Sequence, residues 1–332
     1  MKWRNLLSPS KVWQATRIES SAIELIVRHG APNVILHFLG GLGDELLMTC
    51  LAREIKKRAP AARIWQICTA AELLHGNPDY TLVLGKGCWA LRHSNLLERW
   101  RVRPQYSRWA VVGRKEILPS EHMLTVMCRQ AGLSGTVELR PWCFLSDAER
   151  QAGRLAQRQI AVQSVGDRTH ETWMLNKTWF HERFQQVVNG VRRRWPEVAV
   201  VQLGVPGDPL LENAHDLRGR TSLRQTAAVL SQCECFLGTV GLLSHLARAV
   251  DCRGVIIFGG RELPHQSGYT CNENLASPLP CAPCGLWQDC DYDRECMRMI
   301  QAPQVLEALE RALAKRGTPL EVDEVDLDQQ RP

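Results

Sequence analysis

Residues 33–53, NVILHFLGGLGDELLMTCLAR, constrain the fold of this chain most. Residues 34–39 form an apolar run typical of a buried strand, the GGLG stretch at 40–43 suits a tight turn, and the apolar residues that follow recur at helical spacing. Glycines let a backbone approach a ligand closely, and the free N–H groups of the new helix point toward it. The segment therefore predicts a strand, a turn and a helix beside a ligand site.

Asp44 follows this turn, in the first turn of the expected helix. One interpretation is an N-terminal cap, because Asp accepts hydrogen bonds from free backbone N–H groups there. The other is a carboxylate base beside a ligand that Gly41 and Gly43 allow to come close. The stretch by itself favours the cap.

Two series of alternating strand and helix patterns follow one another along the chain. The first series covers residues 33–145, with further strand patterns at 62–68, 81–85 and 109–113. The second covers residues 150–302, with strand patterns at 160–166, 198–204, 235–238 and 254–260. Such alternation predicts an α/β fold of two Rossmann-like, doubly wound domains that face each other across a cleft.

The segments outside the two series are shorter. Residues 1–32 form a basic, Trp-containing extension, for which we prefer packing on its own domain over contact with an anionic membrane surface. Residues 303–316 predict a C-terminal amphipathic helix with Val305, Leu306, Leu309 and Leu313 on one side, expected to pack back toward the first domain. The acidic tail covers residues 317–332, of which residues 321–332 are expected to be disordered.

Composition limits the kinds of ligand and the cellular location that we expect for this protein. The 332 residues carry a net charge of +6 and are 45% hydrophobic, which permits an anionic ligand but does not indicate nucleic acid. No apolar run reaches transmembrane length, and the N-terminus lacks the apolar core of a secretory signal. Thirteen cysteines without such a signal favour reduced thiols. We expect a cytoplasmic protein, with at most peripheral contact with the inner face of the membrane.

A cysteine-rich segment at 281–296 is the second distinctive feature. Its cysteines follow the pattern C-x2-C-x5-C-x5-C, and they are Cys281, Cys284, Cys290 and Cys296. Four thiolates suit tetrahedral zinc or iron, and the filled shell makes such a metal structural. The alternative is four free thiols packed under a loop.

Two other function classes fit poorly. A dinucleotide-dependent oxidoreductase needs GxGxxG, but Leu46 stands at the last glycine position and no acid follows the second strand until Glu72. A nucleic-acid-binding module built on the cysteine segment would carry dense basic residues there, and the segment has Asp289, Asp291 and Asp293 instead.

The glycine turn with Asp44, the NKTW stretch at 176–179, and residues 215–260 together resemble the heptosyltransferase family of bacterial glycosyltransferases. The resemblance covers roughly residues 33–310 and keeps the order of the family's motifs. It implies the GT-B fold, an acceptor bound by the first domain and a nucleotide-diphospho-sugar donor, usually ADP-heptose, bound by the second. It also implies inverting transfer to a glycan or protein hydroxyl, as in lipopolysaccharide biosynthesis, without a catalytic cofactor.

The resemblance further implies roles for single residues. Asp44 takes the place of the catalytic base, and Lys177 that of the lysine beside the donor diphosphate. The donor phosphates would bind around the start of a helix, at Thr239, Gly241, Ser244 and His245. Ordinary alternatives are capping for Thr239 and Ser244 and a packed, hydrogen-bonded role for His245.

This chain departs from the family at one point: Val240-Gly241-Leu242 stands where many members have Asp-Ser/Thr-Gly. The departure affects the expected donor contacts and the identity of the donor sugar. A catalytically inactive, glycosyltransferase-like scaffold or nucleotide-sugar-binding protein is therefore the alternative function. A similar cysteine-rich segment occurs in part of the family, including relatives with cysteine-bound iron.

Overall fold

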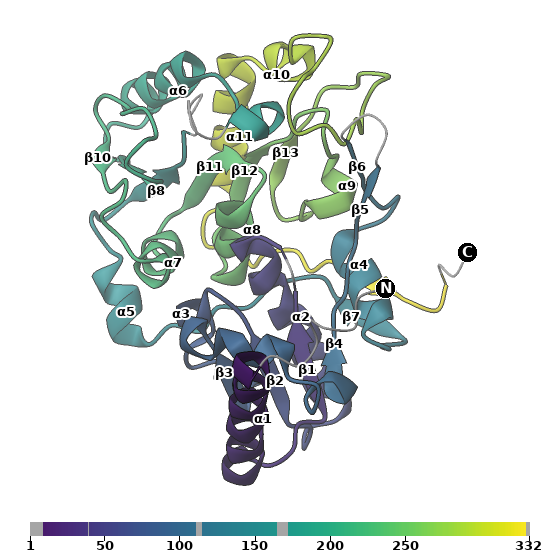
Figure 1. Ribbon diagram of the computed structural model, residues 1–332. Helices are drawn as coiled ribbons and strands as arrows, with labels where there is room; N and C mark the ends of the chain where they lie inside the picture. Colours follow the sequence, from purple (N-terminus) through teal and green to yellow (C-terminus); the bar gives the residue numbers. More distant parts are fainter. Residues whose placement is uncertain (1–8, 39, 111–114, 165–171, 330–332) are drawn as a thin grey trace.

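The computed structural model describes residues 9–38, 40–110, 115–164 and 172–329. It contains two parallel sheets, one above the other in Figure 1. Helices cover both, and each sheet has apolar cores of its own. Cores on the facing sides meet at α2 (Leu42–Arg58) and α8 (Leu242–Ala249), which contact each other at the junction between the sheets. The described part of the chain thus has the α/β architecture that the alternating pattern predicted.

The first sheet has the order β3-β2-β1-β4, and its strands are all parallel. Val34 pairs with Ile64 in register, so the two longest strands bury their apolar residues together. The strands are β1 (Val34–His37), β2 (Ile64–Ile67), β3 (Leu82–Leu84) and β4 (Arg101–Val102). Its helical elements are α3 (Ala71–Leu74), η2 (Lys86–His93), η3 (Glu98–Trp100) and α4 (Met123–Gln130), besides α2.

The second sheet has the order β10-β9-β8-β11-β12-β13 and is also fully parallel. Its strands are β8 (Gln159–Val162), β9 (Ala199–Gln202), β10 (His215–Asp216), β11 (Cys235–Thr239), β12 (Gly254–Ile257) and β13 (Glu273–Leu275). Helices α6 (His181–Arg194) and α11 (Ala302–Ala314) cover one face, and α7 (Leu223–Ser231) and α8 cover the other. The remaining helical elements are α5 (Asp147–Ala152), η4 (Thr172–Lys177), α9 (Pro264–Ser267) and α10 (Glu295–Met299).

The strand predicted at 109–113 does not join the parallel sheet. Arg108–Ala110 (β5) instead pairs antiparallel with Lys115–Ile117 (β6) in a separate hairpin, and residues 111–113 lie outside the described residues. Trp109 is 64% exposed, so this strand has no apolar face to bury in a sheet. The fourth strand of the sheet is β4, within the Arg- and Trp-rich stretch, where Arg101 and Arg103 pair with Glu98.

Two expectations about the C-terminal part are wrong. Helix α11 does bury the predicted apolar side, but against α6 and strands β11, β12 and β13, not toward the first sheet. The tail is not disordered over the described residues up to 329, because β14 (Glu324–Asp326) pairs antiparallel with β7 (Thr136–Glu138). Val325 and Leu327 alternate with acidic residues and join the core beside Val137, which explains the pairing.

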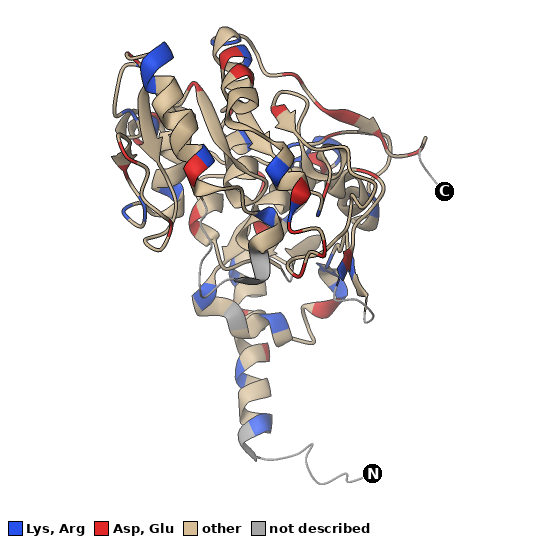
Figure 2. Ribbon diagram, turned by 90° about the horizontal axis from the view of Figure 1, so that it is seen from above, with Lys and Arg blue, Asp and Glu red and all other residues tan. Residues whose placement is uncertain are grey.

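The N-terminal extension contains α1 (Pro9–His29), which extends away from the body of the molecule in Figure 2. Its C-terminal half packs on the first sheet through Ala22 and Ile26, whereas Trp13 is 65% exposed. Basic and acidic segments are intermixed along the ribbon in the same view, in keeping with the mild net charge. No helix in the described ranges combines the length and apolarity that a membrane span requires.

Candidate active site

Asp44 lies where the first sheet meets the second, and it caps its own helix. Its Oδ2 accepts the backbone N–H of Gly41 at 2.8 Å, as the capping interpretation predicted. A Cβ added at Gly40 would lie 2.5 Å from the same oxygen, so the turn needs glycine there to leave room for the carboxylate.

Tyr106 holds the second oxygen of Asp44. Its hydroxyl donates to Oδ1 at 2.7 Å, and its ring stacks on Phe38 with centroids 5.7 Å apart. Burial raises the pKa of Asp44, while the hydrogen bonds from Tyr106 and Gly41 and the charge of Lys177 lower it in part, leaving the pKa above its ordinary value. The half-buried carboxylate is therefore held in one orientation and is a stronger proton acceptor than an exposed Asp.

The glycine turn touches the start of α8 in the second sheet. A Cβ added at Gly43 would lie 3.5 Å from Cα of Leu242 and 3.6 Å from Cδ2 of His245. Gly41 and Gly43, from the first series of strands, thus lie on the same side as Gly241, from the second. The predicted turn and the predicted phosphate-binding helix start face the same interdomain space.

The polar residues at the start of α8 have partners within the chain. Ser244 Oγ accepts the N–H of Gly241 at 3.1 Å, so Ser244 caps the helix. The Nδ1 of His245 lies 2.8 Å from the hydroxyl of Tyr269, and burial lowers the pKa of His245 to about 4, so the ring is neutral at pH 7. Thr239 is the buried last residue of β11, directly before Val240.

Lys177 ends η4 and reaches the junction from the second sheet. Its Nζ lies 2.6 Å from Oε1 of Glu262 and 5.2 Å from the ring centroid of Trp287. The neighbouring Asn176 is buried and fixed to the cysteine-rich segment, because its N–H donates to the carbonyl of Trp287 at 3.0 Å. Its amide also donates to the carbonyls of Leu286 and Gln288, both at 3.2 Å. The cysteine-rich segment therefore supports the backbone that carries Lys177.

Arg261 and Glu262, which follow β12, connect Lys177 to the first sheet. Arg261 Nη1 donates to Glu262 Oε1 at 2.9 Å, its Nη2 pairs with Glu116 of β6, and its guanidinium lies 3.7 Å from the Trp287 ring centroid. Burial acts to raise the pKa of Glu262, but the charges of Lys177 and Arg261 and the hydrogen bonds from Lys177 and Ser267 lower it to about 2.

The cysteine-rich segment also contacts the β5–β6 hairpin. Glu116 N–H donates to the Gly285 carbonyl at 2.9 Å, and Lys115 forms a β-bridge with Leu286. Gly285 has a φ of +65°, and a Cβ there would lie 1.9 Å from the Glu116 oxygen. Only glycine permits this approach, which brings the hairpin and the support of Lys177 together.

The four predicted metal-binding cysteines lie in one loop region, and the proximity of the other three thiols contributes to raising the pKa of Cys284 beyond what burial does. Soft thiolates are the right donor type for zinc or iron. In this structure, however, no three His, Cys, Asp or Glu side chains of the described residues are arranged to hold a metal ion. All thirteen cysteines fall within the described ranges and are free thiols there. The donor chemistry fits a metal, but the arrangement does not form a closed site.

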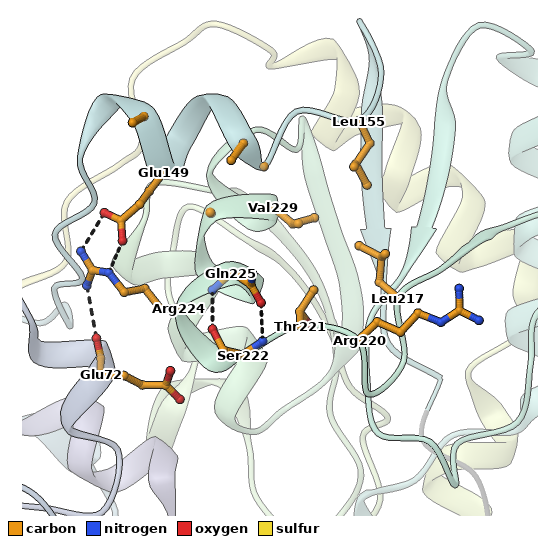
Figure 3. A pocket seen from close by; sticks show the side chains of 14 residues that line it. Glu72, Glu149, Leu155, Leu217, Arg220, Thr221, Ser222, Arg224, Gln225 and Val229 are labelled. Carbon is orange, nitrogen blue, oxygen red and sulfur yellow. Dashed lines mark hydrogen bonds and ion pairs between the residues drawn. The ribbon is translucent and has the colours of Figure 1, made fainter.

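A pocket of about 720 Å³ lies between α5, α7 and the loop before α7 (Figure 3). Leu155, Leu217 and Val229 provide apolar walls, and Arg220 extends along one side. Thr221 and Ser222 also line it. Ser222 Oγ accepts the N–H of Gln225 at 3.2 Å, so the capping role is present. Arg224 joins Glu149 to the carbonyl of Glu72 across one end of the pocket.

The structure brings Asp44, Lys177, Gly41, Gly43 and the start of α8 to one junction. Sequence reasoning missed Tyr106 and Glu116, which come from a loop and a hairpin without a motif. Glu262 could be predicted from the sequence, because it directly follows a parallel strand and ligand-binding residues lie at the carboxyl ends of such strands.

Comparison with known proteins bears on the fold and on the second half of the chain. Residues 145–289 match the model of glycosyltransferase family 9 (heptosyltransferase). Comparison with curated proteins gave no match.

Three solved structures have a similar fold. The first is E. coli ADP-heptose lipopolysaccharide heptosyltransferase II, which is 16% identical over 85% of this chain and 99% of that one, with a TM-score of 0.64. The second is a family 9 glycosyltransferase from Veillonella parvula DSM 2008, which is 15% identical over 85% of this chain and 97% of that one, with a TM-score of 0.60. The third is the iron-containing dodecameric glycosyltransferase TibC from enterotoxigenic E. coli H10407, which is 16% identical over 86% of this chain and 77% of that one, with a TM-score of 0.64. TibC is also known in complex with ADP-D-β-D-heptose, again at 16% identity over 86% of this chain and 77% of that one, with a TM-score of 0.63. The chain therefore has the GT-B fold of these glycosyltransferases, and its residues 145–289 match a family 9 (heptosyltransferase) glycosyltransferase domain.

Proposed function

We propose that this chain transfers a sugar, most simply heptose, from a nucleotide-diphospho-sugar to a hydroxyl of a glycan or protein acceptor, with inversion. One observation carries the proposal. Asp44, from the first series, and Lys177, from the second, lie close enough at one junction for the charge of Lys177 to lower the pKa of Asp44. A proton acceptor and a cation at the same place are what this transfer requires.

Asp44 is the general base in this proposal. The acceptor oxygen attacks the anomeric carbon, its proton passes to the Asp44 carboxylate, and the bond from that carbon to the diphosphate oxygen breaks with its electron pair. The raised pKa of Asp44 supports the role, because a base nearer to the operating pH accepts a proton more readily.

Lys177 stabilises the departing diphosphate. An ammonium has three N–H donors, and Glu262 takes one at 2.6 Å, so others are left for phosphate oxygens. Charge that is already in place where negative charge develops lowers the barrier most. This proposed chemistry has no step at a catalytic cofactor.

ADP-heptose is the proposed donor. TibC, whose fold this chain shares, is known in complex with ADP-D-β-D-heptose. The start of α8, with Gly241 and the neighbouring Thr239, Ser244 and His245, offers free N–H groups and the positive end of a helix dipole for the diphosphate. Val240 is buried and supplies no carboxylate, so sugar recognition here relies on other residues.

The first domain is proposed to bind the acceptor. A pocket of about 490 Å³ adjoins Tyr106, whose hydroxyl bonds to the base, and Arg103, Arg108 and Gln130 also line it. An acceptor in this pocket would have its hydroxyl on the Asp44 side. We further propose that the cysteine-rich segment binds structural zinc or iron through Cys281, Cys284, Cys290 and Cys296, as TibC is iron-containing.

Thermal unfolding with ADP-, GDP-, UDP- and dTDP-sugars tests the donor, since a ligand that binds only the folded protein raises Tm. Sugar-labelled ADP-heptose, incubated with glycan and protein extracts of the source cells, tests transfer. We expect a selective rise in Tm with ADP-heptose and label in one extract. Stabilisation without transfer would instead support a nucleotide-sugar-binding protein, and no stabilisation by any donor would contradict the proposal.

A further inference from the structure

A cluster of four charged side chains, one of them Lys177, links the two domains. Glu262 and Arg261 have side chains 4% exposed, Glu116 is 9% exposed and Lys177 is 15% exposed. Lys177 and Arg261 both donate to Oε1 of Glu262, at 2.6 and 2.9 Å. Ser267 Oγ donates to the other oxygen at 2.8 Å. Both oxygens of Glu262 are therefore fixed.

We propose that Glu262 is the positioning residue for Lys177, and that Glu116 of the first domain holds Glu262 in place through Arg261. The inference rests on the proposed role of Lys177 in sugar transfer. A lysine has a long flexible stem, and its ammonium is a point charge that by itself fixes no direction. A carboxylate that Arg261 and Ser267 hold rigid gives this ammonium one location, while the Trp287 ring lies 5.2 Å from it.

The energetic setting favours a functional role over a purely structural one. Buried ion pairs are expensive to desolvate, and apolar residues of similar size often serve stability equally well. Here two carboxylates and two cations are desolvated together, and one of the cations is Lys177, whose charge acts on Asp44. Such an arrangement is expected where a site must hold charge in a set direction before the substrate arrives.

A single loop of the first domain connects this cluster to the base. Ser107 Oγ donates to Glu116, and the adjacent Tyr106 donates to Asp44 at 2.7 Å. Consecutive residues thus orient the base directly and the lysine through Glu116, Arg261 and Glu262. The two groups that must act in the same step share one support.

Glu262→Gln tests the proposal, because it keeps the size of the side chain and removes its charge. The variant is made in the wild-type chain and in a Lys177→Ala chain, and kcat and KM for labelled transfer are measured for all four proteins. We expect Glu262→Gln to lower kcat about 100-fold, the order of loss when a reacting group is displaced by about 1 Å, with little change in donor KM. In the Lys177→Ala chain the same substitution should cause almost no further loss.

Glu54→Gln is the matched control. Glu54 is also a buried carboxylate with two cationic partners, Lys57 at 2.7 Å and Arg58 at 2.6 Å, but it lies within α2 away from the cluster. It should lower Tm and leave kcat unchanged. Ser267→Ala provides a second, milder variant in case Glu262→Gln does not fold, with a smaller loss of kcat that also disappears without Lys177.

The outcomes separate this inference from the proposed function. If Lys177→Ala retains wild-type transfer, the role of Lys177 is wrong, and the positioning role falls with it. If Lys177→Ala is inactive while Glu262→Gln or Ser267→Ala is fully active, only the positioning role is overturned. An equal loss from Glu262→Gln with and without Lys177 overturns it as well, because the residue would then act on folding and not through the lysine.

Discussion

Gly285→Ala is the sharpest structural test of how the two domains meet. Gly285 has a φ of +65°, and an added Cβ would lie 1.9 Å from the backbone oxygen of Glu116. A left-handed conformation costs a non-glycine residue about 1–2 kcal/mol, and forcing a methyl group into a packed contact costs about 1–3 kcal/mol more. We expect the free energy of unfolding to fall by about 2–5 kcal/mol.

Gly132→Ala is the control that separates the two contributions. Gly132 has a φ of +78°, and no heavy atom lies within 4 Å of its added Cβ. Its substitution should therefore cost only the backbone contribution, about 1–2 kcal/mol. Urea unfolding of both variants, followed by tryptophan fluorescence, gives the difference that belongs to the contact with the hairpin.

Transfer activity completes this test. Gly285→Ala should push the β5–β6 hairpin away from the cysteine-rich segment, weaken the pair between Glu116 and Arg261, and lower kcat, whereas Gly132→Ala should leave kcat unchanged. Equal destabilisation by both variants, together with wild-type kcat for Gly285→Ala, would refute the close approach and its link to Lys177.

Three further predictions concern the site itself. Asp44→Ala should keep its circular dichroism spectrum and lose transfer by at least ~100-fold, the lower range for a general base, and near-normal transfer would contradict the assignment. Cys284→Ser should lower Tm and the metal-to-protein ratio measured by mass spectrometry, and an unchanged ratio would refute metal coordination. Tyr106→Phe removes a hydrogen bond to a carboxylate, worth about 1.5–3 kcal/mol, which favours the charged form. Its loss raises the pKa of Asp44, so the acidic limb of kcat/KM should move to higher pH, while Tyr80→Phe, which removes a buried hydroxyl without a hydrogen-bond partner, should not move it.

Much of the fold could be predicted because burial follows local periodicity. Val305, Leu306, Leu309 and Leu313 recur at helical spacing, and all four are buried in α11. The prediction that this helix packs toward the first domain was wrong, because the sequence shows which face of a helix is apolar but not which surface covers that face.

The predictions for the tail and for the β5–β6 hairpin were wrong because neither segment has a strong local pattern of apolar residues. The acidic residues around Val325 and Leu327 suggested disorder. The two apolar side chains nevertheless alternate with acidic ones, and Leu327 is buried and Val325 partly buried beside β7. The β5–β6 hairpin has an exposed Trp109 and strands of three residues, so no apolar alternation marks it as antiparallel. Long-range pairing, not local preference, decides both segments.

The candidate site also depends on long-range pairing that the local sequence does not indicate. Asp44 and Lys177 stand next to recognisable sequence motifs and could be proposed from the sequence. Glu116 is brought to the site only by a hairpin that reaches Gly285 in the other half of the chain. That hairpin docks on the segment whose carbonyls hold Asn176, the residue before Lys177. The position of Lys177 therefore depends on the contact between the hairpin and the cysteine-rich segment. It follows that changes at this contact should lower kcat before they weaken donor binding, because the start of α8 lies outside the contact between the hairpin and the cysteine-rich segment.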